Sequence, residues 1–493
     1  MKKLPIGIQT FRDIRSDDYI YIDKTDIAFD IIQNYRYVFL SRPRRFGKSL
    51  FLDTLKNIFE GKKDLFKGLA IYDKWNWEEK YPVIKISFGG STNTQELINS
   101  IEYNLRQNER ALNLDEENLK KSDYAIYFAE LIEAAHSKYN QKVVILIDEY
   151  DKAILDNIEN IEKAHEAREF LRGFYSVIKG SDEYIRFAFL TGVTRFSKAS
   201  IFSGLNMLTD ITLDERFGNV CGYTQSDLEE SFKEYIEKFK PDMEKVKEWY
   251  NGYNFLRDKL YNPFDILQFF DKGGMFKNYW FSTGTPTFLL KLIKERNYFL
   301  PNLSNIVADE KLLDSFDIED IDLEVLLFQS GYLTIDTVEE KARGGFLYKL
   351  KIPNKEVQQS FYDFIIDYML SKNKAASSVV QDDLYDSLIN GDMESFKVNL
   401  ISLFASIPYQ NFVKNDIGEY EGFYASAIYA YLASLGFEIY GEDVTNQGRI
   451  DLTLKLPGKI YLFEFKVVDE DPLFQIKEKK YYQKYLSSGA EVY

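Results

Sequence analysis

Cysteine and histidine are scarce in this chain of 493 residues, which contains one cysteine, Cys221, and two histidines, His136 and His165. A single cysteine excludes an internal disulfide framework and is typical of a reducing, cytoplasmic environment. Two histidines exclude a histidine-rich zinc site. Any metal must therefore be held by carboxylates, which favours Mg²⁺, Mn²⁺ or Ca²⁺.

Long apolar runs are also missing. No stretch reaches the ~20 apolar residues of a membrane-spanning helix, and the N-terminal MKKLPIGIQTF lacks the apolar region of a signal peptide. We therefore expect a cytoplasmic protein with no membrane partner. The net charge of −16 excludes a uniformly basic nucleic-acid binder but is compatible with a local basic groove.

Short apolar runs alternate with helical patterns in the N-terminal part of the chain. The runs YVFLS, YPVIKISF, KVVILID and IRFAFLTG are typical of buried strands. Their alternation with helices predicts an α/β domain over residues 1–225, with a parallel sheet flanked by helices. Residues 226–383 are predicted to be mostly helical, with short strands near GYLTID and FLYKLKIP. The polar segment 373–383 marks the expected boundary of a third unit, 384–493.

The segment SRPRRFGKSL, residues 41–50, connects the first predicted strand to a helix. A phosphate-binding loop directs backbone N–H groups and a helix N-terminus at the anion, with Lys48 on the outer phosphates and Ser49 on Mg²⁺. The usual motif has a glycine where this chain has Arg42. The segment alone therefore leaves two alternatives, a nucleotide site or a basic turn before a helix.

Two further polar elements favour the nucleotide site. The strand KVVILID ends in Asp148, followed by Glu149, and ligands of open α/β sheets bind outside the carboxyl ends of the strands. Asp148 is expected to complete the Mg²⁺ shell, and Glu149 to orient or deprotonate the attacking water. The strand FLTGVTR supplies Thr191, Thr194 and Arg195 as candidate sensors of the γ-phosphate.

Four segments together resemble a bacterial AAA-ATPase-like family whose members often carry a C-terminal PD-(D/E)xK nuclease-like domain. They are IGIQTFRDIRSDDYIYIDKTDIAFDII, RPRRFGKSLFLDTLKNIFEG, LIDEYDKAI and TGVTRFSKASIFSGLNMLTDIT, within residues 4–225. The resemblance implies a P-loop NTPase that binds ATP and Mg²⁺, and in that family the RPRRFGKS form is normal. The expected nucleotide contacts are Arg44, Arg45, Phe46, Gly47, Lys48, Ser49, Asp148, Thr194 and Arg195. The family also places the element Asp23-Lys24-Thr25 near the nucleotide.

A second chemical pattern lies in GRIDLTLKLPGKIYLFEFKVV, residues 448–468. A turn centred on Pro457-Gly458 predicts a β-hairpin whose register places Asp451 opposite Glu464, with Cβ atoms about 5 Å apart. Lys466 then lies on the same face as Glu464. Opposed carboxylates repel unless a cation lies between them, so the pattern predicts a divalent metal site suited to phosphodiester cleavage. The alternative is a solvated hairpin face with an ion pair to Lys466.

A third acid is expected on the preceding helix EGFYASAIYAYLASLGF, where Glu421 precedes an apolar stripe and Glu419 is the competitor. Residues 405–486 resemble the nuclease-like domain of the same family. This resemblance implies a restriction-endonuclease-like α/β fold and a metal site of Glu421, Asp451 and Glu464 for Mg²⁺ or Mn²⁺. It also implies that Gln475 and Lys479 lie near a phosphate backbone. The family's domain usually continues with a further strand, so a chain ending in SSGAEVY leaves two alternatives, a truncated sequence or a naturally shorter domain.

These patterns favour an ATPase coupled to a metal-dependent nuclease acting on DNA or RNA, with a role in defence or mobile-element processing. One alternative is a nucleotide-controlled interaction switch whose nuclease-like domain only recognises nucleic acid or a partner. Another is an ATP-binding scaffold that involves no nucleic acid. The segment KEKKYYQKY mixes lysines with tyrosines as nucleic-acid channels do, although the pattern favours an amphipathic surface helix. The sequence leaves the oligomeric state open.

Overall fold

The computed structural model describes residues 1–88, 93–114, 123–195, 205–280, 287–296, 298–310, 317–370, 374–405, 421–466 and 472–493. By compactness the chain divides into two units. The first comprises Met1–Trp280 and Ala308–Tyr348, and the second Phe281–Val307 and Lys349–Tyr493. These units do not coincide with the boundaries predicted at 225 and 383, which stay predictions. From Lys374 on, the backbone of the expected boundary segment is helical.

A five-stranded parallel sheet forms the core of the first unit, in the order β2-β3-β4-β1-β5. The strands are β1 Tyr37–Ser41, β2 Val83–Ser87, β3 Val143–Asp148, β4 Ile185–Gly192 and β5 Thr209–Asp210. The four longer strands confirm the strands predicted from the apolar runs of the sequence. Because β4 lies between β1 and β3, the residues that follow these three strands meet at one edge of the sheet.

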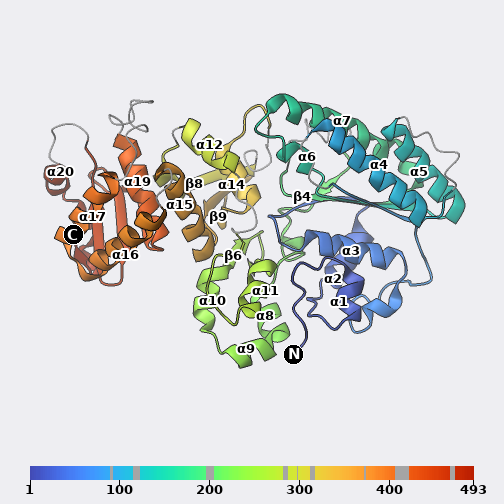
Figure 1. Cartoon of the computed structure of the whole chain (residues 1–493), viewed down its shortest axis with the longest axis horizontal. Coiled ribbons are helices and arrows are strands. Elements are labelled where there is room, and N and C mark those ends of the chain that lie inside the picture. Colours follow the sequence, from blue (N-terminus) through green and yellow to red (C-terminus); the bar gives the residue numbers. More distant parts are fainter. Residues whose placement is uncertain are drawn as a thin grey trace. The chain divides into compact units, whose positions relative to one another are not determined.

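Helices cover both faces of this sheet, which explains why β1 and β3 are buried along their whole length. Figure 1 shows α4, α5 and α7 on one face and α1, α2 and α3 on the other. The helices of this part are α1 Phe11–Ser16, α2 Thr25–Asn34, α3 Lys48–Phe59, α4 Thr94–Ala111, α5 Tyr124–Tyr139, α6 Lys152–Leu155 and α7 Ile161–Gly180, with 3₁₀ turns Lys63–Phe66, Asp182–Tyr184 and Glu215–Phe217.

A helical segment with an aromatic core completes the first part of this unit. Its elements are α8 Gln225–Ser231, α9 Lys233–Phe239, α10 Met243–Tyr250, β6 Asn251–Asn254, β7 Lys259–Tyr261 and α11 Pro263–Asp271. Helix α8 begins with a capping box between Thr224 and Asp227, which satisfies backbone N–H groups at the helix start. Phe232 and Phe270 stack in the core with ring centroids 5.3 Å apart.

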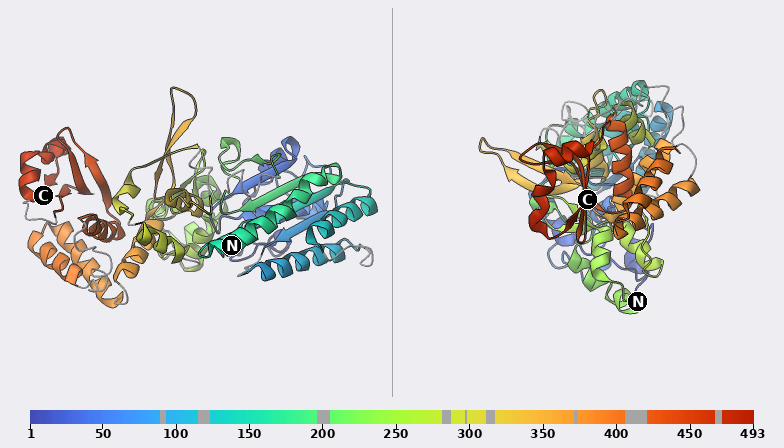
Figure 2. Two further views of the ribbon diagram at one scale, coloured as in Figure 1. Left: turned by 90° about the horizontal axis from the view of Figure 1, so that it is seen from above. Right: turned by 90° about the vertical axis from the view of Figure 1, so that its left-hand side faces the viewer.

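A three-stranded sheet in the order β8-β10-β9 follows along the chain. The elements between residues 287 and 370 are α12 Thr287–Glu295, the 3₁₀ helix η6 Leu300–Ser304, β8 Ile306–Asp309, α14 Leu323–Ser330, β9 Thr334–Glu340, β10 Phe346–Lys351 and α15 Lys355–Leu370. Figure 2 shows β9 and β10 as a projecting hairpin arm. Strands β9 and β10 confirm the two strands predicted in this region.

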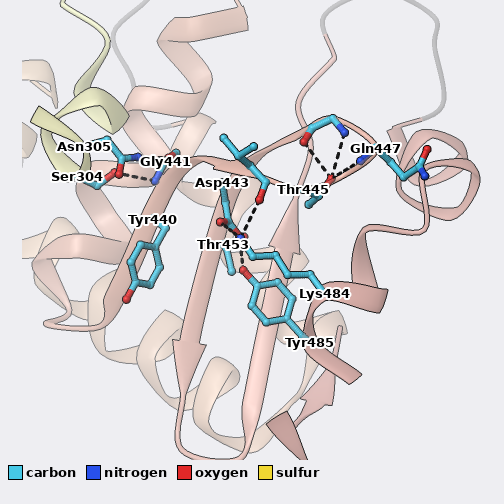
Figure 3. A network of polar contacts seen from close by, with 12 residues as sticks. Ser304, Asn305, Tyr440, Gly441, Asp443, Thr445, Gln447, Thr453, Lys484 and Tyr485 are labelled. Atoms are coloured by element: carbon cyan, nitrogen blue, oxygen red, sulfur yellow. Dashed lines mark hydrogen bonds and ion pairs between the residues drawn. The ribbon is translucent and has the colours of Figure 1, made fainter. Parts of the chain in front are cut away.

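The C-terminal sheet of the second unit has the order β11-β12-β13-β14. Its elements and those before it are α16 Lys374–Asn390, α17 Met393–Ala405, α19 Glu421–Ser434, β11 Glu438–Val444, β12 Arg449–Leu456, β13 Lys459–Phe463, α20 Pro472–Glu478, the 3₁₀ helix η8 Tyr481–Ser488 and β14 Glu491–Val492. Gly441 of β11 fits closely against η6, because its N–H donates to the Ser304 hydroxyl at 3.0 Å (Figure 3).

The register of the hairpin β12–β13 confirms the sequence prediction. Leu456 pairs with Lys459 across the turn, and Leu454 pairs with Tyr461. The apolar side chains of Leu452 and Leu454 are fully buried. The next residues along this ladder after Leu452 and Phe463 are Asp451 and Glu464, which are therefore neighbours on adjacent strands.

A short strand follows the helical segment near the end of the chain, and truncation of the domain stays a prediction. Strand β14 pairs in parallel with β13, with Lys459 opposite Glu491. The ring of Tyr493 stacks on Tyr461 at 4.8 Å. Two residues are too short to show the alternation by which a strand is recognised in a sequence.

None of the helices in the described part of the chain is long and apolar enough to span a membrane.

Candidate nucleotide and nuclease sites

Arg42, which stands in place of the loop glycine, is buried behind the loop and 1% exposed. Its guanidinium donates to the carbonyls of Ser41, Thr212, Phe217 and Gly218 at 2.8–3.3 Å. The same group lies 3.9 Å from the centre of the Phe255 ring. Burial lowers the pKa of Arg42 to about 10, against the charges of Cys221 and Asp210. The loop tolerates arginine here because the side chain leaves on the core side.

Lys48 lies at the start of α3, inside the loop. Its Nζ donates to the carbonyls of Arg42 at 2.8 Å and Pro43 at 2.9 Å. Burial lowers the pKa of Lys48, and the charge of Asp148 is the largest effect opposing this. Gly47 has a left-handed φ of 96°, and no side chain in the described structure caps α3. The first N–H groups of α3 are therefore available to an anion.

The other predicted loop residues divide into exposed and buried ones. Arg44 and Arg45 are exposed, and the Arg45 guanidinium lies 5.1 Å from the Phe264 ring centre. Phe46 is fully buried and packs edge-on against Tyr253 at 4.9 Å. The Phe46 side chain thus belongs to the core, and only its backbone is available to a ligand at the loop.

The segment after α10 holds the loop from outside. The Arg44 carbonyl accepts hydrogen bonds from the Trp280 indole at 3.3 Å and from the Asn262 amide at 3.4 Å. Gly331 lies so close to Pro43 that an added Cβ would approach the proline ring to 2.7 Å. The loop conformation therefore depends on residues more than 200 positions away in the sequence.

The acidic end of β3 lies close enough to Lys48 for the charge of Asp148 to raise the pKa of Lys48, against the effect of burial. Asp148 is 4% exposed and accepts a hydrogen bond from the Glu149 N–H at 3.0 Å. Glu149 has a left-handed φ of 53°, a strained conformation for this residue. Burial, and then the charge of Asp148, raise the pKa of Glu149, as suits a group that accepts a proton.

Asp151 is a polar residue that the sequence interpretation missed. Its carboxylate accepts hydrogen bonds from the N–H groups of Val193 at 3.0 Å and Thr194 at 2.5 Å, and from the Thr194 hydroxyl at 2.5 Å. A Cβ added to Gly192 would approach this carboxylate to 2.4 Å. Asp151 thus joins the acidic turn after β3 to the end of β4. The sequence contains it as the last acidic residue of DEYD, residues 148–151, directly after the apolar strand.

The predicted sensor residues have partners within the protein. The Thr194 hydroxyl is on Asp151, Arg195 forms an ion pair with Asp210, and the Thr191 hydroxyl donates to the Leu40 carbonyl at 2.9 Å. A role for Thr194 and Arg195 as sensors of the γ-phosphate stays a prediction.

The element Asp23-Lys24-Thr25 joins three parts of the first unit. Asp23 accepts hydrogen bonds from Thr25 and from the Ala70 N–H at 2.7 Å, and Lys24 pairs with Asp227 at 2.7 Å. These contacts supply a structural role that the sequence did not reveal.

Asp451 and Glu464 form the centre of the second candidate site. Asp451 accepts a hydrogen bond from the Phe465 N–H at 2.8 Å, and the Glu464 side chain is 2% exposed. Burial, and then the charge of Asp451, raise the pKa of Glu464 to about 7, while Lys466 at 3.5 Å opposes this. Glu464 Oε2 is buried and has no hydrogen-bond partner among the described residues. A buried oxygen without a partner beside a second carboxylate fits a divalent cation.

Gln475 completes the surroundings of Glu464, because its side-chain amide donates to Glu464 Oε1. Lys479 is exposed one helical turn later. Glu421 begins α19, but its side chain lies outside the described residues, as does Glu419 altogether. No group of three acidic, histidine or cysteine side chains suited to a metal occurs in the part of the chain that is described, so a third ligand stays a prediction.

Comparison with known proteins identifies the families of the two domains in which the candidate sites lie. Residues 5–202 match the family described as "Predicted AAA-ATPase", and residues 419–493 match the PD-(D/E)XK nuclease superfamily. An "Uncharacterized protein in vnfD 5'region" of Azotobacter chroococcum mcd 1 is 45% identical over 501 residues, covering 100% of this chain and 95% of that protein. The chain belongs to this AAA-ATPase-like family with a nuclease-like C-terminal domain. No solved structure matches it.

Substitution of Arg42 tests whether its buried guanidinium holds the loop. Replacing Arg42 by glycine restores the usual loop motif but leaves four carbonyls without their buried donor. We expect Arg42→Gly to lower the free energy of unfolding by about 3 kcal/mol or more, and to reduce ATP turnover. Urea unfolding and an ATPase assay measure the two effects.

Arg44→Gly is the matched control for stability, because Arg44 lies on the same loop with an exposed side chain. It should change the free energy of unfolding far less than Arg42→Gly does. Wild-type stability of Arg42→Gly would show that the buried guanidinium does not hold the loop.

Proposed function

We propose that this protein hydrolyses ATP and uses it to control a metal-dependent nuclease that acts on DNA or RNA. The observation that carries the nuclease half is the buried, unpartnered oxygen of Glu464 beside Asp451. The family supports an ATPase linked to a nuclease-like domain, and the roles of individual residues are our proposal. A place in defence or mobile-element processing stays a hypothesis by association.

In the ATPase half, the loop N–H groups and the start of α3 bind the phosphates. Lys48 exchanges its two loop carbonyls for phosphate oxygens, and the exposed Arg44 and Arg45 contact the outer face of the nucleotide. Ser49 and Asp148 hold Mg²⁺, which neutralises charge on the phosphates when bound. Glu149 orients the attacking water and accepts its proton, for which a raised pKa is suited.

In the nuclease half, Asp451 and Glu464 hold Mg²⁺ or Mn²⁺. When bound, such an ion supplies Lewis acidity and lowers the pKa of a bound water. Lys466 stabilises the negative charge that develops on the phosphate, from its position 3.5 Å from Glu464. Gln475 fixes the orientation of the Glu464 carboxylate through its hydrogen bond to Oε1.

Trp280 connects the nucleotide loop to the rest of the chain. Its indole donates to the Arg44 carbonyl, and its ring packs at 5.2 Å against Tyr332. Trp280 is also the last residue of the first unit before the chain enters the second. A change in the loop peptides on nucleotide binding would alter this hydrogen bond. We therefore propose that Trp280 transmits the nucleotide state towards the nuclease-like unit.

The two activities should separate by substitution. Cleavage that depends on Mg²⁺ or Mn²⁺ should be abolished in two variants, the double variant Asp451→Asn, Glu464→Gln and the single variant Lys466→Ala. ATP turnover should be unchanged in both. Lys48→Ala should abolish ATP turnover, since it removes the cation from the phosphates. Cleavage is measured on labelled single-stranded and duplex DNA and RNA, with and without ATP. ATP turnover is measured in parallel as phosphate release.

Cleavage at the full wild-type rate by the Asp451→Asn, Glu464→Gln protein would eliminate this site as the nuclease. EDTA should abolish cleavage by the wild type as the double substitution does, but unlike the substitution it should also stop ATP turnover, which uses Mg²⁺ at Ser49 and Asp148. Cleavage that persists in EDTA would contradict the metal requirement.

Substitution of Trp280 tests the coupling. Trp280→Phe removes the indole N–H but keeps an aromatic ring, and the Asn262 amide still donates to the Arg44 carbonyl at 3.4 Å, so ATP turnover should stay within about twofold of the wild type. The ratio of cleavage rates with and without ATP should fall towards one. Trp75→Phe is the control, because the Trp75 indole nitrogen makes no hydrogen bond to any described residue. A ratio unchanged by Trp280→Phe would contradict the proposal.

A nucleotide-controlled switch without cleavage is the second candidate. The net charge of −16 favours it. It predicts ATP-dependent binding of nucleic acid or a partner with no cleavage in the same assay.

A further inference from the structure

The segment Pro472–Ser488, which we call the 472–488 face, is locally basic in an acidic protein. It contains four lysines and one glutamate, whereas the whole chain has a net charge of −16. The segment consists of α20 and η8, which contact each other. A positive patch on a strongly negative chain favours an anionic partner.

A polar network fixes η8 on the C-terminal sheet (Figure 3). Asp443 of β11 accepts hydrogen bonds from Lys484 and Tyr485 of η8, and from the Thr453 hydroxyl at 2.9 Å. Burial works to raise the pKa of Asp443, but the bonds from Lys484, Tyr485 and Thr453 lower it overall. The helix is therefore held in a defined orientation.

The inward side chains of the 472–488 face pack on the sheet. Tyr481 and Tyr485 are buried against Ile460 and Leu462, and Ile476 of α20 packs on the same cluster. Because these side chains define the inner surface, the outer side is formed by exposed residues next to them in the sequence, such as Lys477, Lys480 and Tyr482. The face is thus an ordered surface with a fixed outer side.

The outer side presents large apolar groups between lysines. Phe474 is 63% exposed, Tyr482 39% and Leu486 67%. The exposed cations are Lys477, Lys479 and Lys480. Surfaces that bind single strands combine cations for the backbone with aromatic rings on which unpaired bases stack.

This face adjoins the candidate nuclease site. Gln475, which donates to Glu464, lies between the exposed Phe474 and the inward Ile476. A strand bound along the face would therefore pass beside Asp451 and Glu464.

We propose that the 472–488 face binds unpaired nucleic acid, with bases stacked on Phe474 and Tyr482 and phosphates on Lys477, Lys479 and Lys480. This inference rests on the proposed nuclease function and assigns its substrate class, a single-stranded or frayed segment. Duplex bases are already stacked on one another, so they cannot occupy exposed rings in this way. A protein partner would lack the regular negative charge that the three lysines match.

Binding of fluorescently labelled oligonucleotides to the full-length protein in EDTA tests the proposal without cleavage. The probes are a mixed-sequence single strand of about 20 nucleotides and its blunt duplex. The single strand should bind more tightly. Phe474→Ala with Tyr482→Ala should weaken single-strand binding about fivefold or more and duplex binding less than twofold.

Replacing Lys477, Lys479 and Lys480 by glutamine should weaken binding of both probes. The slope of log affinity against log salt should fall by about 2 for the single strand. Tyr103→Ala and Lys397→Gln are matched controls, since both residues are exposed on other helices, and should have no effect. Thermal unfolding of each variant checks that the protein stays folded.

Three results would overturn the inference: ring variants with wild-type single-strand affinity, equal losses for the duplex, or wild-type protein that binds neither probe. The last would leave a protein ligand as the occupant of the face. A parallel cleavage assay with Mn²⁺ separates this inference from the nuclease function. Single-strand binding that depends on Phe474 and Tyr482 without any cleavage would retain the surface and reject the nuclease.

Discussion

Removal of charged groups from water is the constraint on which both candidate sites depend. In the first unit the buried charges are matched by neutral backbone groups: Arg42 and Lys48 by carbonyls, Asp151 by N–H groups. These bonds hold the loop and the acidic turn in place before any ligand arrives, as preorganisation requires. At Glu464 one buried oxygen lacks such a partner in the described structure. We interpret the nucleotide loop and the acidic turn as a preformed site for phosphate. We interpret the pair of Asp451 and Glu464 as a site that binds a cation.

The same constraint relates the nucleotide loop to its surroundings. The glycines of a usual loop let its backbone approach the phosphates closely, whereas this loop is held by a buried arginine, by the Phe46 ring and by Trp280. We propose that such a loop transmits a local change, because its carbonyls are hydrogen-bonded to residues distant in the chain. In the nuclease-like domain the corresponding link is Gln475, which joins the proposed cleavage site to the 472–488 face.

Local patterns in the sequence predicted the parts of the structure that local physics determines. The four longer strands of the first sheet follow from apolar runs, and the pairing of β12 with β13 follows from a two-residue turn. The role of Arg42 could not be predicted, because its partners lie about 170 residues away. Strands β5 and β14 are too short to show periodicity. The small, polar residues of 373–383 resemble a linker, although the backbone forms α16 from Lys374 on. Asp151 and the contact of Gln475 depend on tertiary packing.

Asp451 and Glu464 are proposed to share a divalent cation. The most direct test is a crystal structure of the full-length protein grown with Mn²⁺, with diffraction data collected at the manganese absorption edge. We predict an anomalous peak bound by one oxygen from each of these two carboxylates, with Lys466 nearby. A structure with Mn²⁺ bound elsewhere, and with the two carboxylates turned away from each other, would contradict the account.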